Sequence, residues 1–570
     1  MCKEGGFLHQ NQNLTLTFNT DGAQVYKSSR EDIWPMYAVI NELPPNLRFK
    51  TENIIVWGVW QGRGKPPTMT FLEPFVNEMK NLYNNGLVLR LRHEERRIRV
   101  AAITGSLDLP AKSEFLNMIG HNGAHGCKDC LIEGAHVVNK KGYSHYYSFE
   151  ATKNAEDRTD EDSISNAREA IEKNKTVNGI KGATFFMALP IFSIRDGIVV
   201  DYMHGILLGV GKTLLNLWFE VGDHKNYYKA HKTYPAYFVG HDIDDVDERL
   251  LKMQPPDFIS RRPRKIDGNI GHLKANELRL WILYYALPCL KDILPETYWN
   301  HFSLLVEGLH IILSDSVSRD DITNARKYFR TFYEDFAKLY EHNLGKCGLN
   351  VHNLYHLCDY VEWWGPAWCW SCFGFENLNG EILKRVHGTK NTTKQILLRF
   401  AAIKEVRETL LSSHTRDVLK SFLRSLSYGG IKRNWVYVSK ETFVSGCLEK
   451  DVYSCYRRGS LIVKGTRYKR STKAINSVVI ALVNSQAYAF QVDFFTVDEK
   501  SVSFHGKLLQ ISNQSIAPKV LQTSKLRVVE GKSEEIYVFN ADTITEKLLL
   551  IDGNNDFQCI SRLPNHFESD

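Results

Sequence analysis

The stretch Arg97–Leu107 has the sequence RIRVAAITGSL, an apolar run rich in β-branched residues that ends directly before Asp108. A short run of this kind, bounded by a polar residue, is typical of a buried β-strand. Residues 13–20, NLTLTFNT, alternate apolar and polar side chains and end before Asp21 and Gly22, so we expect a strand that leads into a turn. Each of these predicted strands therefore ends at an aspartate.

Further apolar runs lie between these two predicted strands. They are WPMYAVI at residues 34–40 and NIIVWGVW at residues 53–60, and both are rich in β-branched and aromatic residues, which favours strands. Residues 71–83 instead carry apolar side chains at helical spacing, which predicts a helix. Three strands, a helix and a fourth strand together predict an α/β sheet. In such sheets, functional groups gather at the carboxyl ends of strands, where Asp21 and Asp108 stand.

The remaining chain changes character twice. Residues 198–219 and 277–344 are dominated by helical periodicity, whereas short β-like runs separated by turn residues follow Gly429 and Gly430. We therefore expect the first part of an α/β core at residues 1–135, an all-α insertion at 136–345, returning helices of the core at 346–428, and a small C-terminal antiparallel β domain at 429–570.

Composition excludes several classes of protein. Of the 570 residues, 43% are hydrophobic and 24% are charged, which excludes a mostly disordered chain, a collagen and a coiled-coil rod. The longest markedly apolar stretch, residues 474–483, is too short to span a bilayer, and the first residues have no apolar signal core, so we expect a soluble intracellular protein. The 11 scattered cysteines favour reduced thiols over a disulfide framework. The net charge of +7 permits a nucleic-acid partner without requiring one.

The first candidate site is formed by Asp21 and Asp108. Two carboxylates at neighbouring strand ends can hold divalent ions, and Mg²⁺ suits such a site because it binds through one or two carboxylates and keeps waters for the substrate. Paired ions of this kind promote phosphoryl displacement. The alternative is that Asp21 is a solvated turn residue and that Asp108 only begins a helix before Leu109 and Pro110.

The second candidate site begins at the pair Cys127-Lys-Asp-Cys130. A C-x₂-C pair presents two thiolates to one tetrahedral Zn²⁺ ion, which needs two further ligands. His352 and His356 are the best candidates, because residues four apart lie on one face of a helix and both imidazoles can reach one ion. We therefore predict a structural zinc site of two cysteines and two histidines.

Other residues compete for the same role. His121 and His125 form a second pair at the same spacing, closer to the cysteines in the sequence. Cys369 and Cys372 form a second C-x₂-C pair, which could complete a site of four cysteines. For these two residues we favour an interpretation as small buried side chains among tryptophans.

Glu376 is the candidate for a third acid. It follows His356 by 20 residues, so a zinc ion that binds His356 beside Cys127 would bring Glu376 close to Asp108. Three acids would then surround the metal pair. Alternatively, Glu376 is an acidic residue in the first turn of a helix, where the helix dipole favours it.

Several stretches, taken together, carry a resemblance to a known family. They are NTDGAQVYKSS (19–29), WPMYAVINELPP (34–45), LDLPAKSEFLNMIGHNGAHGCKDC (107–130), VVDYMHGILLGVGKTLLNLWF (199–219) and NVHNLYHLCDYVEWWGPAWCWSCFGFENLNGEILKRVHGT (350–389). The chain resembles transposases of DNA transposons with a ribonuclease-H-like DDE core, most closely the CACTA (En/Spm)-like group and its animal transposase-domain-containing relatives. The order of its zinc and acidic residues is also similar to that of the V(D)J recombinase catalytic subunit.

The resemblance implies a ribonuclease-H-like mixed sheet interrupted by the all-α insertion, and a nuclear protein that cleaves and transfers DNA strands. It implies that Asp21, Asp108 and Glu376 bind two Mg²⁺ or Mn²⁺ ions; Glu362 and Glu381 are alternatives to Glu376. The implied ligands of a structural Zn²⁺ ion are Cys127, Cys130, His352 and His356. DNA is the implied partner, a homo-oligomer is allowed, and no membrane is involved.

Two further expectations follow from the resemblance. The motif Asp201-Tyr-Met-His204 would supply a group beside the site, or it would be a packed helix-start aspartate and a core histidine. Complete transposases of this kind carry a DNA-binding segment before the first catalytic strand, whereas Asp21 stands near the start of this chain. We therefore expect a truncated or decayed copy, or DNA binding through the insertion and C-terminal regions. The alternative functions are an inactive domesticated transposase that binds DNA or another partner, and a nuclease without strand transfer.

Overall fold

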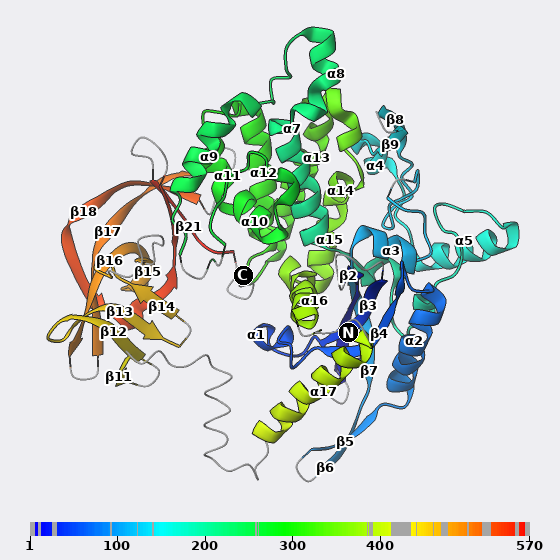
Figure 1. The fold of residues 1–570 in the computed structure, drawn as a ribbon, viewed down its shortest axis with the longest axis horizontal. Coiled ribbons are helices and arrows are strands. Elements are labelled where there is room, and N and C mark those ends of the chain that lie inside the picture. Colours follow the sequence, from blue (N-terminus) through cyan, green and yellow to red (C-terminus); the bar gives the residue numbers. More distant parts are fainter. Residues whose placement is uncertain are drawn as a thin grey trace. The chain divides into compact units, whose positions relative to one another are not determined.

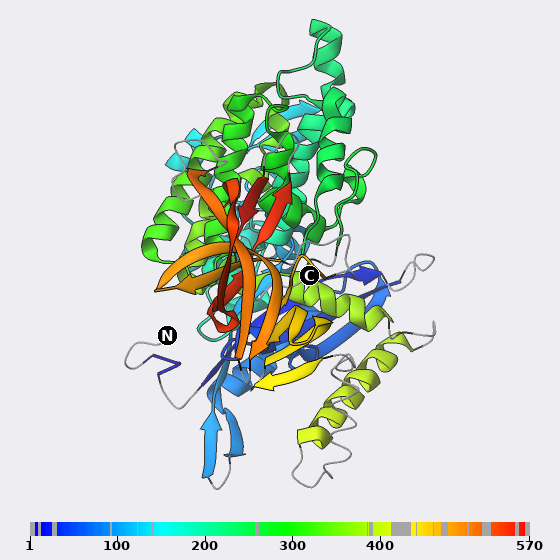
Figure 2. The same ribbon diagram turned by 90° about the vertical axis from the view of Figure 1, so that its left-hand side faces the viewer.

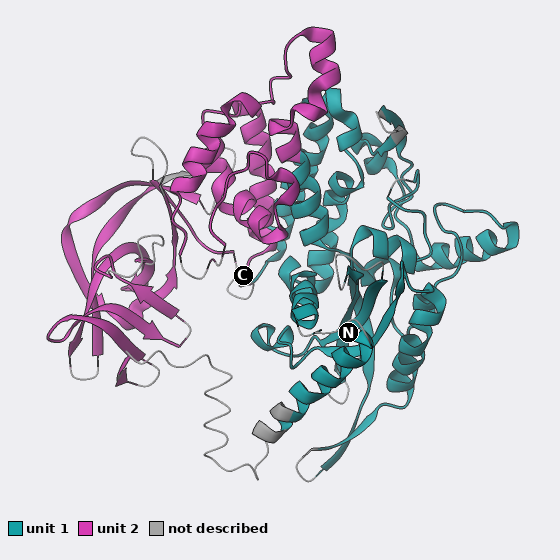
Figure 3. Ribbon diagram, in the orientation of Figure 1, with its two compact units in different colours: residues 1–213, 316–413 teal, residues 214–315, 414–570 magenta. Residues whose placement is uncertain are grey.

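The computed structural model describes residues 6–9, 13–24, 31–91, 94–121, 123–139, 142–256, 259, 261–384, 386, 391–411, 435–439, 442–459, 461–468, 477–498, 501–515, 526–552 and 558–564. Contacts between residues divide the chain into unit 1, Met1–Thr213 with Ser316–Ser413, and unit 2, Leu214–Asp315 with His414–Asp570 (Figure 3). The four segments predicted from the sequence are a different division and stay a prediction. Residues 25–29, 387–389, 412–428 and the predicted boundary at Gly429 and Gly430 lie outside the described residues.

Unit 1 is built around a mixed sheet, which comprises six strands among the described residues. Their bounds are β1 (Leu14–Thr20), β2 (Ala23–Gln24), β3 (Glu31–Ile40), β4 (Ile55–Arg63), β7 (Val100–Leu107) and β10 (Ile198–Val200). The order is β10-β7-β1-β3-β2, and β4 also pairs with β3 (Figure 1). Strands β1, β7 and β10 are parallel, whereas β3 is antiparallel to both β1 and β4. The carboxyl ends of β1, β7 and β10 therefore lie at one edge of the sheet.

The predicted α/β core is confirmed in this sheet. The predicted strands 13–20, 34–40 and 53–60 correspond to β1, β3 and β4, and the predicted helix 71–83 lies within α2 (Thr68–Asn84). The run that ends at Asp108 is divided, because its first residues belong to β6 (Glu94–Ile98), which pairs with β5 (Leu87–Leu91). Figures 1 and 2 both show this hairpin extending away from the sheet.

Strand β10 corrects the sequence analysis, which assigned residues 198–219 to helical structure. Ile198–Val200 instead pairs with β7, with Ile198 opposite Gly105 and Val200 opposite Leu107. A strand of three residues is too short for its alternation to be distinguished from the apolar helix that follows it. The β-branched sequence Ile-Val-Val before Asp201 repeats the pattern of a strand that ends in an aspartate.

Helices cover both faces of the sheet. On one face, α2 buries Leu72, Phe75 and Met79, and the ring of Phe75 lies 5.4 Å from the ring of Phe18 on β1. On the other face, Phe375 of α16 (Phe373–Lys384) stacks on Tyr37 of β3. Burying side chains of this size stabilises the fold by about 1.5–3 kcal/mol each. The sheet is therefore held between helices, and α16 is fixed against it.

The other elements of unit 1 are mostly helices. They are α1 (Pro45–Arg48), α3 (Leu109–Phe115), β8 (Ala135–Asn139), β9 (Gly142–Tyr146), α4 (Phe149–Asn154), α5 (Asp160–Lys173), η1 (Phe185–Ala188), α6 (Ile194–Gly197), the π-helix η2 (Met203–Gly211), α13 (Arg319–Leu339), η6 (Glu341–Lys346), α14 (Leu349–His352), α15 (Leu354–Trp364), η7 (Ala367–Trp370) and α17 (Thr392–Leu411). The hairpin of β8 and β9 shows that the predicted all-α region 136–345 does not begin with a helix.

Unit 2 contains a helical part and a β part. Its helices are α7 (Lys212–Phe219), which begins at the end of unit 1, α8 (Val221–His231), η3 (Gly240–Asp242), α9 (Ile243–Lys252), η4 (Ile270–His272), α10 (Ala275–Leu280), η5 (Trp281–Tyr285), α11 (Ala286–Leu290) and α12 (Glu296–Ile312). Trp218 of α7 is buried edge-on against Phe302 of α12, as expected for a helical core.

The C-terminal antiparallel β domain predicted from the sequence is confirmed. Its strands are β11 (Val436–Ser439), β12 (Thr442–Glu449), β13 (Val452–Arg458), β14 (Leu461–Lys464), β15 (Val478–Val483), β16 (Gln486–Asp498), β17 (Ser501–Ser515), β18 (Leu526–Asn540), β19 (Ile544–Lys547), β20 (Leu549–Asp552) and β21 (Gln558–Ser561). The longest strands curve around a core that includes Phe490, Phe495 and Phe504 (Figure 2). No helix among the described residues has both the length and the apolar character that crossing a membrane requires.

Candidate functional site

Asp21 and Asp108 follow directly after the parallel strands β1 and β7. Phe18 of β1 pairs with Gly105 of β7, and each aspartate stands three residues further along its strand. This register brings the two aspartates to the same edge of the sheet. Gly105 is needed for this pairing, because a Cβ atom there would lie 2.5 Å from the ring of Phe18.

Asp108 also begins helix α3. Its Oδ1 atom accepts a hydrogen bond of 2.7 Å from the backbone N–H of Ala111, and Pro110 stands in the first turn. Asp108 can therefore both begin a helix and bind a metal, because an N-cap uses only one carboxylate oxygen. The cap fixes the direction of the carboxylate and leaves its second oxygen outside this hydrogen bond.

Glu376 lies in the first turn of α16, and its side chain is 45% exposed. Its Oε1 atom lies 3.4 Å from Nε2 of His204. The two alternative acids interact elsewhere: Glu381 forms an ion pair of 3.0 Å with Lys384, and Glu362 forms one of 3.0 Å with Arg326. Of the three glutamates considered, Glu376 is the one that lies beside the strand-end acids.

The carboxyl group of Asp21 is partly buried and lies near the other two acids. Its pKa is raised from the usual 3.8 to about 7, first by burial and then by the negative charges of Asp108 and Glu376, while His204 acts in the opposite direction. Repulsion between carboxylates that share a site raises a pKa in this way. Asp21, Asp108 and Glu376 therefore lie within electrostatic reach of one another, and a divalent cation bound there would relieve their repulsion.

Asp201 is a third aspartate at this edge, at the end of β10. Its side chain is 1% exposed, and its Oδ1 atom accepts a hydrogen bond of 3.0 Å from the backbone N–H of Cys372. Its Oδ2 atom accepts bonds of 3.0 Å from the backbone N–H of His204 and of 2.7 Å from Nδ1 of His204. Although burial acts to raise it, these bonds hold the pKa of Asp201 below its usual value.

His204 lies in the π-helix η2, between Asp201 and Glu376. Burial acts against its charge, but its hydrogen bonds with Asp201, Cys372 and Glu376 raise the pKa of the imidazole far above its usual value. The imidazole therefore lies between the carboxylates of Asp201 and Glu376. Sequence reasoning left the roles of Asp201 and His204 open, since their contacts depend on how β10 and α16 meet.

Cys372 belongs to this hydrogen-bonded group. Its thiol is buried, 3.2 Å from Oγ of Ser106, and a ligand atom of Cys372 lies within 4.8 Å of ligand atoms of Asp201 and His204. The hydrogen bonds among these residues account for their closeness without an ion. Cys372 thus lies among the acids and not beside the other C-x₂-C pair, and Cys369 is not part of either candidate metal group among the described residues.

A separate, buried group is formed by Cys127, Cys130, His352 and His356. Their ligand atoms all lie within 4.8 Å of one another. The predicted gathering of these side chains is therefore confirmed, and the group could hold a metal ion. His121 and His125 do not join it within the described part of the chain, and Nδ1 of His125 instead lies 3.2 Å from the carbonyl oxygen of Ile132.

The donor atoms of this group fit a thiolate-binding metal. Burial acts to raise the pKa of Cys127, but a hydrogen bond with Cys130 and the charges of His352 and His356 bring it well below its usual value. The Nε2 atom of His356 is buried and has no hydrogen-bond partner among the described residues. A buried ring nitrogen without a partner, beside a thiol that favours its anion, is the arrangement that a tetrahedral zinc ion would satisfy.

Residues around this group orient its ligands. The Nδ1 atom of His352 lies 3.0 Å from Oγ1 of Thr152 and 3.3 Å from the hydroxyl of Tyr333, which leaves Nε2 directed at Cys130. Arg158, also buried, donates from Nε to the carbonyl oxygens of Cys127 and Cys130 at 3.0 and 3.1 Å. Such contacts fix ligand geometry in metal sites. Sequence reasoning missed Thr152, Tyr333 and Arg158, because no motif connects them with the ligands.

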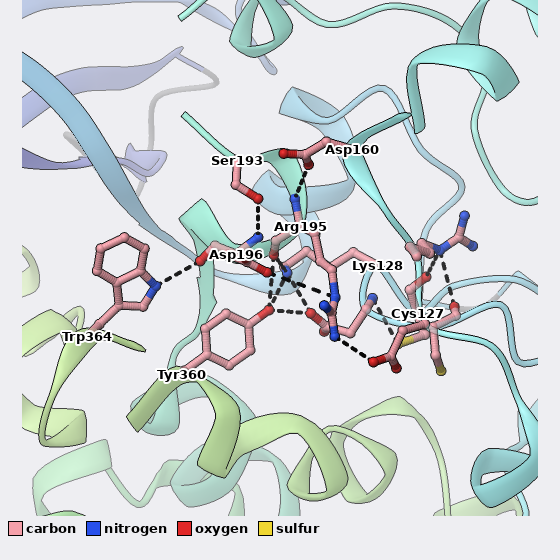
Figure 4. Close-up of polar contacts among 12 residues, drawn as sticks. Cys127, Lys128, Asp160, Ser193, Arg195, Asp196, Tyr360 and Trp364 are labelled. Carbon is pink, nitrogen blue, oxygen red and sulfur yellow. Dashed lines mark hydrogen bonds and ion pairs between the residues drawn. The ribbon is translucent and has the colours of Figure 1, made fainter. Parts of the chain in front are cut away.

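The two residues between the cysteines form a buried ion pair. Nζ of Lys128 lies 2.7 Å from Oδ1 of Asp129, and each side chain is 4% exposed. Tyr360 of α15 hydrogen-bonds to both of them, and its hydroxyl also reaches the carbonyl oxygen of Arg195 at 3.4 Å (Figure 4). This burial could not be predicted from the sequence, because Lys and Asp side chains normally lie at the surface. The ion pair connects the cysteine turn with α15, which carries His356.

The comparison with protein families bears on the first part of the chain. Residues 2–179 match the model of the transposase family tnp2. The match includes Asp21, Asp108, Cys127 and Cys130. The comparison with curated proteins gave no match. The family match supports a transposase-like function and, with it, DNA as a partner.

Proposed function

We propose that this protein is a transposase, of the CACTA-like group with a ribonuclease-H-like core, that cleaves and transfers DNA strands at a site of Asp21, Asp108 and Glu376. The observation that carries the proposal is the pairing of β1 with β7, which brings Asp21 and Asp108 to one edge of the sheet, close enough to Glu376 for its charge to act on Asp21. The mixed sheet supports the core fold, since its parallel strands end in acidic residues at one edge. A nuclear location and a homo-oligomer form part of this proposal.

The acids of the site would hold two Mg²⁺ or Mn²⁺ ions. Bound ions would lower the pKa of the attacking water and neutralise charge on the phosphate. The chain itself supplies carboxylates from β1, β7 and α16, which are held apart by the sheet and the helix that carry them. Attack of water on phosphorus breaks a P–O bond and leaves a 3′-hydroxyl and a 5′-phosphate. In strand transfer, that 3′-hydroxyl attacks a phosphodiester of the target and displaces its 3′ oxygen as a new hydroxyl.

Cys127, Cys130, His352 and His356 would bind a structural Zn²⁺ ion. All four of its ligand positions would be filled by protein, which is typical of a structural and not a catalytic zinc site. The ion would connect the segment after Asp108 with the helices that return to the sheet. Since Glu376 follows His356 by 20 residues, this connection supports the placement of the third acid.

The test is cleavage of supercoiled plasmid DNA with Mn²⁺ as the only divalent ion. We expect Asp108→Asn and Glu376→Gln to lower the rate by about 100-fold or more, because each removes a charged ligand where charge develops. Glu381→Gln, on the same helix but paired with Lys384, should cleave like the wild type. Circular dichroism and bound zinc should be unchanged in all variants. Unchanged cleavage by Asp108→Asn would overturn the proposal.

The same assay separates the alternative functions. A wild-type protein that binds DNA but never cleaves it would be an inactive, domesticated transposase. Hydrolysis without joining of the new 3′-end to a second DNA molecule would indicate a nuclease. Joined products, detected by sequencing the junctions, would support strand transfer.

A further inference from the structure

We propose that Asp201 and His204 are positioning residues that hold Glu376 in the orientation needed to bind metal. The inference rests on the proposed function, since it assigns a role within that site. It is carried by hydrogen bonds that lead from one buried carboxylate to Glu376 along two separate routes.

The first route runs through the backbone of α16. Oδ1 of Asp201 accepts the hydrogen bond from the N–H of Cys372, directly before the helix begins. The carbonyl oxygen of Cys372 in turn accepts the hydrogen bond of 2.9 Å from the N–H of Glu376. Asp201 therefore fixes the first turn of the helix on which Glu376 stands, and so fixes the position of its Cα atom.

The second route runs through the side chain of His204. Its backbone N–H and its Nδ1 atom both bind Oδ2 of Asp201, so the ring has little freedom to rotate. Its Nε2 atom lies 3.4 Å from Oε1 of Glu376. The imidazole thus bridges the two carboxylates and restrains the outer end of the glutamate, which is 45% exposed and would otherwise adopt several rotamers.

The sheet explains why Asp201 can do this. Val200 pairs with Leu107, so Asp201 follows β10 at the level at which Asp108 follows β7. Unlike the half-exposed Glu376, the Asp201 side chain is 1% exposed, and both of its oxygens accept hydrogen bonds from the protein. Asp201 is therefore not available to bind substrate or metal, and it acts by holding His204 and the start of α16 in place.

The experiment measures the Mn²⁺ dependence of the site. Variants Asp201→Asn and His204→Gln would be compared with the wild type in Mn²⁺ binding, followed by electron paramagnetic resonance, and in plasmid cleavage over a range of Mn²⁺ concentrations. We expect the Mn²⁺ concentration for half-maximal cleavage to rise by about 10–100-fold, since loss of a supporting contact weakens metal binding to this extent. The rate at saturating Mn²⁺ should recover to near the wild-type value.

The control is His241→Gln, which removes a histidine that pairs with Asp242 and whose side chain is 68% exposed. Its Mn²⁺ dependence should equal that of the wild type. Bound zinc should be unchanged in His204→Gln. If Asp201→Asn fails to fold, His204→Gln alone decides the inference.

A double variant tests whether the effect passes through Glu376. In the Glu376→Gln background, His204→Gln should not weaken residual Mn²⁺ binding further, because coupled residues are not additive. An equal further loss in that background would overturn the inference, as would an unchanged Mn²⁺ dependence of His204→Gln. If Glu376→Gln and Asp108→Asn themselves bind Mn²⁺ and cleave like the wild type, the proposed function fails. If they are defective and His204→Gln is not, this inference alone fails.

Discussion

The Sγ atom of Cys130 lies 3.5 Å from the Nε2 atom of His352, although 222 residues separate them in the sequence. The intervening chain contains much of the helical structure and also strand β10 of the sheet. Joining two points so far apart removes conformational freedom mainly from the unfolded chain. A metal bound here would therefore stabilise the return of the helices to the sheet more than a local site could.

Replacing Cys130 by serine should remove the metal and destabilise unit 1. Structural metal loss is among the few changes that cost about 4–5 kcal/mol or more in unfolding free energy. The measurements are zinc content by atomic emission and unfolding in urea. Cys447→Ser changes an exposed thiol and should retain both values. Unchanged zinc content and unchanged unfolding in Cys130→Ser would show that any bound zinc lies outside this group.

Lys128→Met should destabilise the protein because it removes the cation that pairs with Asp129. It leaves the buried carboxylate of Asp129 without its cation, and breaking a buried ion pair costs about 3–5 kcal/mol. Lys173→Met breaks an ion pair with Glu169 whose side chains are 55% and 41% exposed, and should change stability little. Unfolding in urea compares the two variants. Equal stabilities would mean that the ion pair beside the cysteines is not buried in solution.

The strand-end acids could be predicted from the sequence because strand and turn patterns are local. Asp21 and Asp108 each end an apolar run that is long enough to be recognised. Asp201 ends a run of only three strand residues, so its strand was mistaken for the start of a helix. The convergence of Glu376 with these acids was inferred from order along the chain, and its actual neighbour, His204, depends on packing between η2 and α16.

The buried cysteine and histidine group shows the same limit. Its four members could be predicted because the spacing of metal ligands is a property of the metal and not of the fold. Thr152, Arg158 and Tyr333 could not, since each reaches the group from a separate helix or loop. Burial of the pair Lys128–Asp129 also depends on tertiary structure, as isolated charges normally favour the surface. Residue spacing thus predicts which side chains could bind a metal. The residues that orient these side chains depend on tertiary packing.

Asp21→Asn should stabilise the metal-free protein, relative to the wild type, more at pH 8 than at pH 5. The folded-state pKa of Asp21, about 7, lies above the usual 3.8, so the folded protein retains this proton longer than the unfolded chain. The wild type therefore loses stability as the pH rises through this interval, and the asparagine variant does not. Thermal unfolding in a chelator at both pH values measures the difference.

The control for this pH effect is Asp292→Asn, at an exposed position whose left-handed backbone suits asparagine. Its effect on thermal unfolding at each pH is subtracted from that of Asp21→Asn. A stabilisation by Asp21→Asn that is equal at pH 5 and pH 8 would contradict the raised pKa of Asp21. Mn²⁺ should reverse the order at pH 8, because the wild type binds it with one more carboxylate.

Gly374→Ala should disturb both the packing of α16 and its metal site. A Cβ atom at Gly374 would lie 2.3 Å from Cδ1 of Phe49, whose ring packs edge-on against Phe375. Because that ring is held by its neighbour, the helix must move, at a cost of about 1–3 kcal/mol. Glu376 stands two residues further along, so its carboxylate moves as well, and the affinity for Mn²⁺ should fall.

Gly380→Ala supplies the matched control on the same helix. No atom lies within 4 Å of a Cβ atom at this position, so alanine should stabilise α16 by about 0.5–1 kcal/mol through its better helix propensity. Its Mn²⁺ dependence should equal that of the wild type. Loss of stability without loss of Mn²⁺ affinity in Gly374→Ala would mean that Glu376 reaches the metal independently of the helix start. Loss of both, with an unchanged Mn²⁺ dependence in Gly380→Ala, would show that the geometry of the acidic site depends on the packing of Phe49 against the helix.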